Sequence, residues 1–196
     1  MDSLQLEIGL DSWITQDGNY PDFEVSQQTA FALEFCSREW LRVQEAPPRL
    51  ESLGDAHYRA CGVVRYTAAD AWVIEFNDVL AFRQQAPPPN VEAGATVAGE
   101  IWLGVDPFFY FETLCRNPGI PPLIYRWRID RIAIETAPFL ESRDERGRSV
   151  FVRDASRHAR EQRRRTDARH DDGGHGDYVL TCTRLPSAPT YCRTGK

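Results

Sequence analysis

The feature that most limits the possible folds is a two-residue hydrophobic period in the aromatic-rich stretch 97–105. Val97, Ile101 and Leu103 occupy odd positions there, whereas mainly small or charged residues lie between them. Successive side chains of a β-strand point to opposite faces of a sheet, so this period predicts a strand with one face in a core. Trp102 lies on the other face, which predicts that this second face is covered as well.

The same period recurs along most of the chain. Further strands are therefore predicted at residues 4–10, 29–35, 57–67, 72–77, 123–136 and 177–182. A proline breaks the central stretch after Asp106, and residues 108–111 are predicted to continue as a second short strand. The hydrophobic phase slips by one residue near Asp130, which predicts a β-bulge.

Roughly seven to nine strands with almost no amphipathic helix indicate an all-β, mainly antiparallel, single-domain protein. Both a closed β-barrel and a β-sandwich fit this pattern, and a small barrel of the oligonucleotide-binding kind is a specific alternative. We expect the β domain to span residues 1–140 and a returning strand at 177–185 to complete it.

Residues 141–176 differ from the rest of the chain because they carry few large apolar side chains. Val150, Phe151 and Val152 are the exceptions. The part at 153–165 is polar all round, which predicts either an exposed helix or a flexible segment. We therefore expect 141–176 to form a polar, arginine-rich insertion into the β domain.

The net charge of -6 is unevenly distributed along the chain. Residues 143–172 contain ten Arg and seven Asp or Glu, a balance of +3, which leaves -9 for the remainder. An acidic body argues against general binding to a phosphate backbone. The insertion also lacks aromatic residues between Phe151 and Tyr178 on which bases would stack. Another protein, possibly a basic one, is therefore favoured as the partner over nucleic acid.

Neither a membrane nor export is expected from the sequence. It contains no apolar run long enough to cross a bilayer, and residues 1–5 do not resemble a signal peptide. The five cysteines are scattered without CxxC spacing, which is typical of reduced proteins. A cytoplasmic location is the expectation.

The sequence shows no catalytic motif of the common kinds: no phosphate-binding loop, no dinucleotide-binding glycine motif, no nucleophile elbow and no HExxH. We therefore expect neither catalysis nor a cofactor. The densest set of potential metal ligands is His170, Asp172, His175 and Asp177. Glycines between them make the loop flexible, so a solvated loop is favoured over a metal site.

A chain rich in aromatic residues and arginine but without catalytic motifs favours a protein-binding module, such as an adaptor or an inhibitor or immunity-type protein. The residues expected to contact a partner are Trp102, Asp106, Phe109, Tyr110, Arg126, Arg128 and Asp130. Among them Tyr110 is the expected surface anchor, and Trp102 is expected to be structural. Two alternatives are a barrel that stacks single-stranded nucleic acid on Trp102, Phe109, Tyr110 or Trp127, and a barrel enzyme or ligand carrier with an interior pocket near the bulge.

Overall fold

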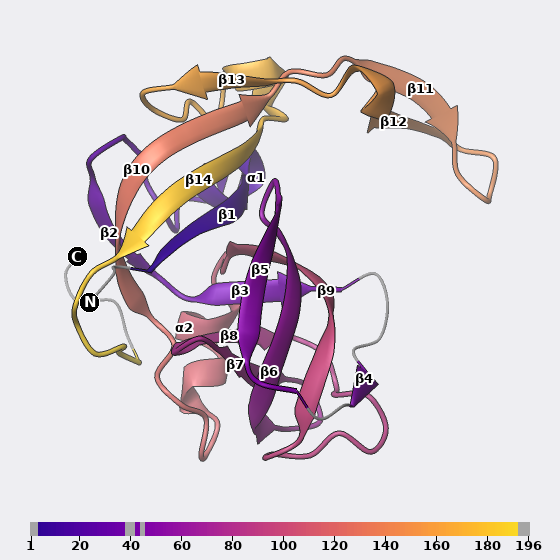
Figure 1. Cartoon of the computed structure of the whole chain (residues 1–196). Helices are drawn as coiled ribbons and strands as arrows, with labels where there is room; N and C mark the ends of the chain where they lie inside the picture. The colour runs from indigo at the N-terminus through magenta and orange to yellow at the C-terminus, as the bar shows by residue number, and fades with distance from the viewer. Residues whose placement is uncertain (1–3, 38–41, 44–45, 192–196) are drawn as a thin grey trace.

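Most of the alternating segments pair into one 12-stranded mixed sheet, part of which closes on itself as a barrel (Figure 1). The structure is a computed structural model, and it describes residues 4–37, 42–43 and 46–191. The helices in these ranges are all too short or too polar to span a membrane.

The secondary structure consists of strands joined by short helical turns. In chain order the elements are β1 (Gln5–Asp11), α1 (Ser12–Gln16), β2 (Gln28–Phe31), β3 (Leu33–Cys36), β4 (Arg42–Val43), β5 (Arg49–Gly54), β6 (His57–Thr67), β7 (Trp72–Phe76), β8 (Val79–Arg83), β9 (Thr96–Val105), α2 (Phe109–Glu112), η1 (Leu114–Arg116), β10 (Tyr125–Glu135), β11 (Phe139–Arg143), β12 (Ser149–Arg153), η2 (Ala155–Arg157), β13 (Arg160–Arg163), η3 (Asp171–Gly174) and β14 (Asp177–Arg184).

Five strands close the barrel because β9 pairs with β3 on one side and with β6 on the other. The circuit runs β9–β3–β8–β7–β6 and returns to β9. The pair β3–β8 is parallel, and the other four pairs are antiparallel. Of the predicted barrel and sandwich, the barrel is therefore confirmed.

The interior of the barrel is packed with large side chains. Phe35 meets Trp72 and Phe76 edge-on, at ring-centroid distances of 5.1 and 6.4 Å. These rings belong to a buried apolar cluster that also includes Ile74 and Leu103. This cluster fills the interior of the barrel, whereas the bulge near which the ligand-carrier alternative places its pocket lies on β10, outside the barrel.

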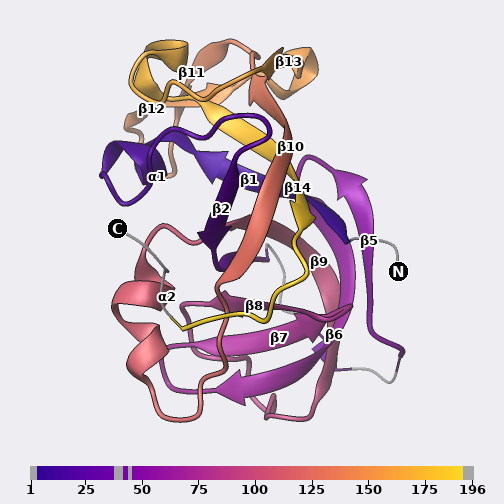
Figure 2. The same ribbon diagram turned by 90° about the vertical axis from the view of Figure 1, so that its left-hand side faces the viewer.

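The sheet continues beyond the barrel through β1, β14 and β10 (Figure 2). β1 joins the barrel by a parallel bridge between Gly9 and Gly104. The Trp102 ring lies against both glycines: a Cβ added to Gly9 would come within 2.0 Å of the ring, and one added to Gly104 within 2.3 Å. Trp102 thus packs over the junction between the barrel and the outer strands, where only glycine leaves room for it.

β10 is the longest outer strand and carries the predicted bulge. Its pairing with β14 shifts register between Ile129 and Arg131. β2 and β13 both pair along its other edge. Neither the exposed helix nor the flexible segment expected at 153–165 describes residues 160–163, because hydrogen bonds to β10 hold this polar segment as the strand β13. The returning strand, β14, lies between β1 and β10.

Residues 109–112 form the short helix α2, so the strand predicted at 108–111 is wrong. The Asp106 carboxylate accepts hydrogen bonds from the backbone N–H groups of Phe108 and Tyr110, at 3.1 and 3.2 Å. A carboxylate that binds free N–H groups at the start of a helical turn stabilises that turn. This local interaction outweighs the strand preference of the aromatic residues.

The segment 107–124 covers the outer wall of the barrel. Tyr110 joins Val73 and Phe82 in a second buried apolar cluster on this side. The Tyr110 hydroxyl donates to the Pro121 carbonyl at 2.8 Å and accepts from the Leu123 N–H at 3.1 Å. Tyr110 is fully buried, so it is not the surface anchor that the sequence predicted.

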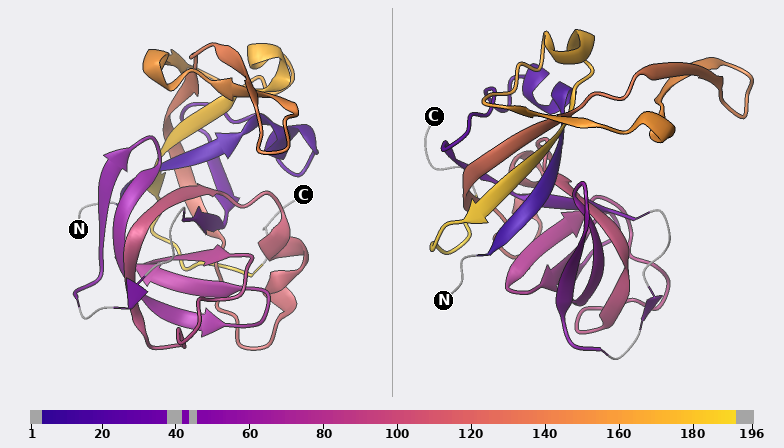
Figure 3. Two further views of the ribbon diagram at one scale, coloured as in Figure 1. Left: turned by 90° about the vertical axis from the view of Figure 1, so that its right-hand side faces the viewer. Right: turned by 45° about the horizontal axis from the view of Figure 1, so that its top comes forward.

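β11 and β12 form a separate two-stranded sheet that projects from the body (Figure 3). We call this hairpin, residues 139–153, the arm.

Candidate protein-binding site

The arm carries a concentration of exposed large apolar side chains. Phe151 is 69% exposed, Leu140 48%, Val152 47% and Phe139 38%. Leu140 lies opposite Val152 and Phe151 lies opposite Glu141, so apolar side chains occur on both faces of the hairpin. An isolated two-stranded hairpin in water has no core of its own to cover such side chains.

The base of the arm is held firmly to the body by Arg153. Its guanidinium contacts Asp172 at 2.5 Å and Asp177 at 3.3 Å, and it donates to the carbonyls of Ala137 and His175 at 2.9 and 3.0 Å. It also lies 3.9 Å from the ring centroid of Phe139. The Arg153 side chain is only 17% exposed, so these contacts form a partly buried anchor.

The tip of the arm is also ordered by local contacts. The Asp144 carboxylate accepts hydrogen bonds from the N–H groups of Arg146 and Arg148, both at 2.9 Å. Gly147 has a φ of 74°, which glycine adopts without strain. Polar contacts thus hold the base and the turn of the arm, and an element that is already ordered loses less entropy on binding than a mobile one.

A large cleft lies between the base of the arm and the outer wall of the barrel, with a volume of about 1320 Å³. On the barrel side it is lined by Arg49, His57, Arg59, Glu100 and Trp102. On the other side it is lined by Asp11, Glu135, Arg153, His158, Arg160 and Asp177. Small-molecule pockets are usually smaller, about 300–1,000 Å³.

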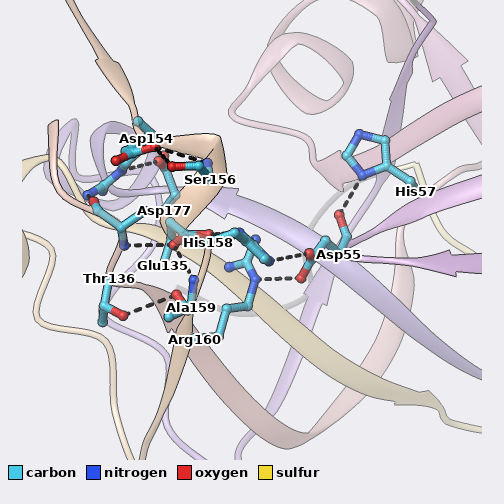
Figure 4. A network of polar contacts seen from close by, with 12 residues as sticks. Asp55, His57, Glu135, Thr136, Asp154, Ser156, His158, Ala159, Arg160 and Asp177 are labelled. Atoms are coloured by element: carbon cyan, nitrogen blue, oxygen red, sulfur yellow. Dashed lines mark hydrogen bonds and ion pairs between the residues drawn. The ribbon is translucent and has the colours of Figure 1, made fainter. Parts of the chain in front are cut away.

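A network of ion pairs joins the two sides of the cleft (Figure 4). Asp55, in the turn between β5 and β6, lies 2.8 Å from Nε2 of His158 and 2.5 Å from Nε of Arg160. Nδ1 of His158 lies 2.5 Å from Glu135. Each ring nitrogen of His158 thus lies within ion-pair distance of a carboxylate, one from each side of the cleft. His158 therefore links the barrel to the arm side.

Two carboxyl groups with raised pKa values, the buried Asp106 and the half-buried Glu34, are not among the residues that line the cleft. Burial, together with the nearby Glu34 carboxylate, raises the pKa of Asp106 to about 7. Burial also raises the pKa of Glu34 to about 7, with Arg83 acting in the opposite direction. Asp106 is fully buried and stabilises α2, so it is not available to a partner.

The other sequence-predicted residues are dispersed over the molecule. Trp102 lines the cleft. Phe109 lies beside the second apolar cluster and packs against Phe108, at a centroid distance of 4.6 Å. Arg126 contacts Gln28 at 2.9 Å on the exposed face of β10.

Arg128 and Asp130 contact each other at 2.7 Å on the same strand. Asp130 also accepts hydrogen bonds from Gln5 and Thr183, at 3.0 and 2.5 Å. Neither residue is among those that line the cleft. The structure therefore brings Trp102 into the candidate site and leaves the other predicted residues outside it.

The alternative metal ligands are occupied by protein groups. Asp172 and Asp177 both contact Arg153, and His170 lies 2.7 Å from Asp167. The His175 ring packs edge-on against Phe139, at 6.3 Å. No three histidine, cysteine or carboxylate side chains converge on a metal position within the described ranges.

Sequence reasoning missed the arm as a binding element. The signal was visible in Val150, Phe151 and Val152, which interrupt an otherwise polar segment. Phe139 and Leu140 were assigned to the end of the β domain, so their pairing with these residues was not anticipated. The residues around His158 in the sequence did not indicate its role, because its two carboxylate partners, Asp55 and Glu135, lie far from it in the chain.

Comparisons with models of protein families, with curated proteins and with solved structures found no match for this chain.

Proposed function

We propose that this protein acts by binding another protein through the arm and the adjoining cleft. The observation that carries this proposal is the set of four exposed apolar side chains on a projecting hairpin. Exposed apolar groups that gather on one element mark interaction surfaces, whereas single exposed residues do not. Elsewhere in the described ranges, the large exposed apolar residues Trp13, Leu53 and Tyr191 are widely separated in the sequence.

The composition of the site is that of a protein interface. Aromatic and aliphatic side chains of the arm lie beside Arg143, Arg146 and Arg148 at its tip. Interfaces favour aromatic residues and arginine, and a few such residues usually supply most of the binding energy. The arm needs little ordering on binding, because Arg153 already fixes its base.

Other observations weigh against the alternative functions. Of the four aromatic residues on which bases would stack, Tyr110 and Trp127 are fully buried, whereas Trp102 and Phe109 are partly exposed. The interior of the barrel is packed with Phe35, Trp72 and their neighbours. The ring nitrogens of His158 are both bound to carboxylates. These features favour a binding role over nucleic-acid recognition or catalysis.

Photo-crosslinking tests the proposal. A benzophenone amino acid replaces Phe151 in the full chain, and Tyr191, exposed to 48%, is replaced in a matched control. In a lysate of the source organism, position 151 is expected to give a discrete crosslink to a different polypeptide that position 191 does not give. Adding Leu140→Ser to the probe at 151 should reduce that crosslink. Equal crosslinking from both positions, or none from 151, would refute the proposal.

A further inference from the structure

The arm is a sheet of only two strands, so each of its strands has an unpaired edge (Figure 3). Within the described ranges, β11 and β12 pair with each other and with no third strand. The backbone N–H and C=O groups along such an edge point away from the hairpin and make no ladder hydrogen bond. These are the groups that a further strand binds when it joins a sheet.

The register of the hairpin identifies the residues whose backbone groups point outward. In an antiparallel pair, opposed residues alternate between those that exchange two hydrogen bonds and those whose N–H and C=O groups point away. The Asp144 N–H donates to the Arg148 carbonyl at 3.0 Å. The Asp154 N–H donates to the Pro138 carbonyl at 2.9 Å. The even-numbered residues between these two bonds therefore form the ladder, and the outward groups belong to residues 149, 151 and 153 on β12 and to 139, 141 and 143 on β11.

The strands that end the 12-stranded sheet carry charges at their edges. β13 and β5 are these end strands. β13 contains Arg160, Glu161 and Arg163, and β5 contains Arg49 and Glu51. Charged side chains on an edge strand discourage pairing with another chain. Both ends of the large sheet are therefore protected.

The edge of β12 lacks this protection. Its three central residues, Val150, Phe151 and Val152, are uncharged β-branched and aromatic residues that favour strands. β11, by contrast, has Glu141 and Arg143 at two of its three outward positions. β12 thus combines unpaired backbone groups with an uncharged, strand-forming centre, which β5, β11 and β13 lack.

The two faces of the arm define the side chains that suit a strand added beside β12. Leu140, Ser142, Val150 and Val152 lie on one face, which therefore bears no charge. Phe151 lies on the other face. Every second side chain of an added strand would lie against the uncharged face. Apolar residues are favoured at those alternate positions, because they would cover Val150 and Val152 from water.

We propose that the partner binds by strand addition: an extended segment, apolar at every second residue, pairs with the outer edge of β12. In this mode of recognition, main-chain hydrogen bonds supply affinity and alternate side chains supply specificity. The inference rests on the proposed function, because it specifies how the partner contacts the arm.

A backbone ester tests the main-chain contact without changing a side chain. Phenyllactic acid, which replaces the backbone N–H of phenylalanine with oxygen and keeps the ring, is incorporated at position 151 of the full chain. The same replacement at Phe139 is the matched control, because that N–H also points outward but lies on the edge of β11. Neither N–H belongs to the ladder, so both esters should leave the arm folded, which nuclear magnetic resonance of the arm amides checks.

The polypeptide captured by the probe at position 151 is titrated into the wild type and into each ester variant by isothermal titration calorimetry. The ester at 151 should weaken binding roughly tenfold, because a buried carbonyl of the partner loses its donor. The ester at 139 should bind like the wild type. Mass spectrometry should place the crosslinked residue of the partner in a segment with apolar side chains at alternate positions.

Wild-type affinity in both esters would overturn strand addition and leave the proposed function intact, because contact through side chains alone needs no backbone donor. Equal weakening by both esters, or weakening by the ester at 139 alone, would show an effect not confined to the edge of β12 and would also overturn the inference. A crosslinked segment whose apolar residues recur every three or four positions would indicate a helix and overturn it as well.

Failure of the proposed function is a separate observation. If position 151 gives no crosslink, or a crosslink only to a second copy of this chain, the proposed function is refuted and the inference falls with it. If position 151 captures a different polypeptide that binds both esters like the wild type, only the inference is refuted.

Discussion

Asp106→Asn should remove a large part of the pH dependence of stability near neutrality. The carboxyl is fully buried, and its pKa is raised from 3.8 to about 7 by burial and by Glu34. Because the folded-state pKa lies above the unfolded value, the protonated group stabilises the fold at low pH. This contribution is complete below the unfolded pKa and is lost as the pH rises through the folded pKa.

The size of the effect follows from the linkage relation. One pKa unit corresponds to about 1.4 kcal/mol, so this shift accounts for about 4 kcal/mol in all. Between about pH 5 and pH 8 the free energy of unfolding should fall by roughly 2–3 kcal/mol through this group alone. Burial raises the pKa of Glu34 in the same direction, so its contribution has the same sign.

Urea unfolding of the wild type and Asp106→Asn at the two pH values measures this effect. Asparagine keeps Oδ1, which accepts from the N–H groups of Phe108 at 3.1 Å and Tyr110 at 3.4 Å, and loses only the Oδ2 contact with Tyr110 at 3.2 Å. The helical turn is therefore retained while the titration is removed. In the variant, the free energy of unfolding should change between the two pH values by roughly 2–3 kcal/mol less than it does in the wild type. Glu112→Gln, which changes an exposed carboxyl in α2, should keep that difference. An undiminished pH dependence in Asp106→Asn would refute the reasoning.

Tyr110→Ala should lower the free energy of unfolding by about 3–5 kcal/mol, because it empties a fully buried aromatic site; a near-zero change in urea unfolding would place the ring at the surface. Gly104→Ala should cost about 1–3 kcal/mol, because the new methyl group meets the Trp102 ring; unchanged stability and tryptophan fluorescence would contradict that contact. Brief trypsin treatment should cleave at residues 143–148 before 163–165, because the latter adjoin or belong to the paired strand β13. Cleavage in the opposite order, read by mass spectrometry, would count against the pairing.

The alternation of apolar and polar residues predicted most of the barrel correctly. β6 begins and ends at the predicted residues, and β7 ends one residue before the predicted end at Asn77, because strands with one face in a core keep their two-residue period. The bulge at Asp130 was also predicted, since one extra residue moves the apolar side chains to the other face. Local pattern did not show that the strand predicted at 29–35 is two strands, β2 and β3, which pair with β10 and β9.

The failures occurred where distant contacts decide the structure. β13 is polar, and only its pairing with β10 makes it a strand. Helix α2 depends on a buried carboxylate, and its aromatic residues pack on a barrel wall formed from other parts of the chain. The sequence also does not show that the arm projects from the body with apolar side chains exposed on both faces. The candidate site depends on that exposure, so it was visible only in three dimensions.

Isothermal titration calorimetry tests most directly whether the protein binds through the apolar side chains of the arm. The partner identified by crosslinking is titrated into the wild-type protein and into Leu140→Ser/Phe151→Ser. These side chains are 48% and 69% exposed, so the double variant should keep the wild-type melting temperature. It should nevertheless bind the partner at least roughly tenfold more weakly, the scale expected for interface anchors. Wild-type affinity in a folded variant would show that the arm is not the binding surface.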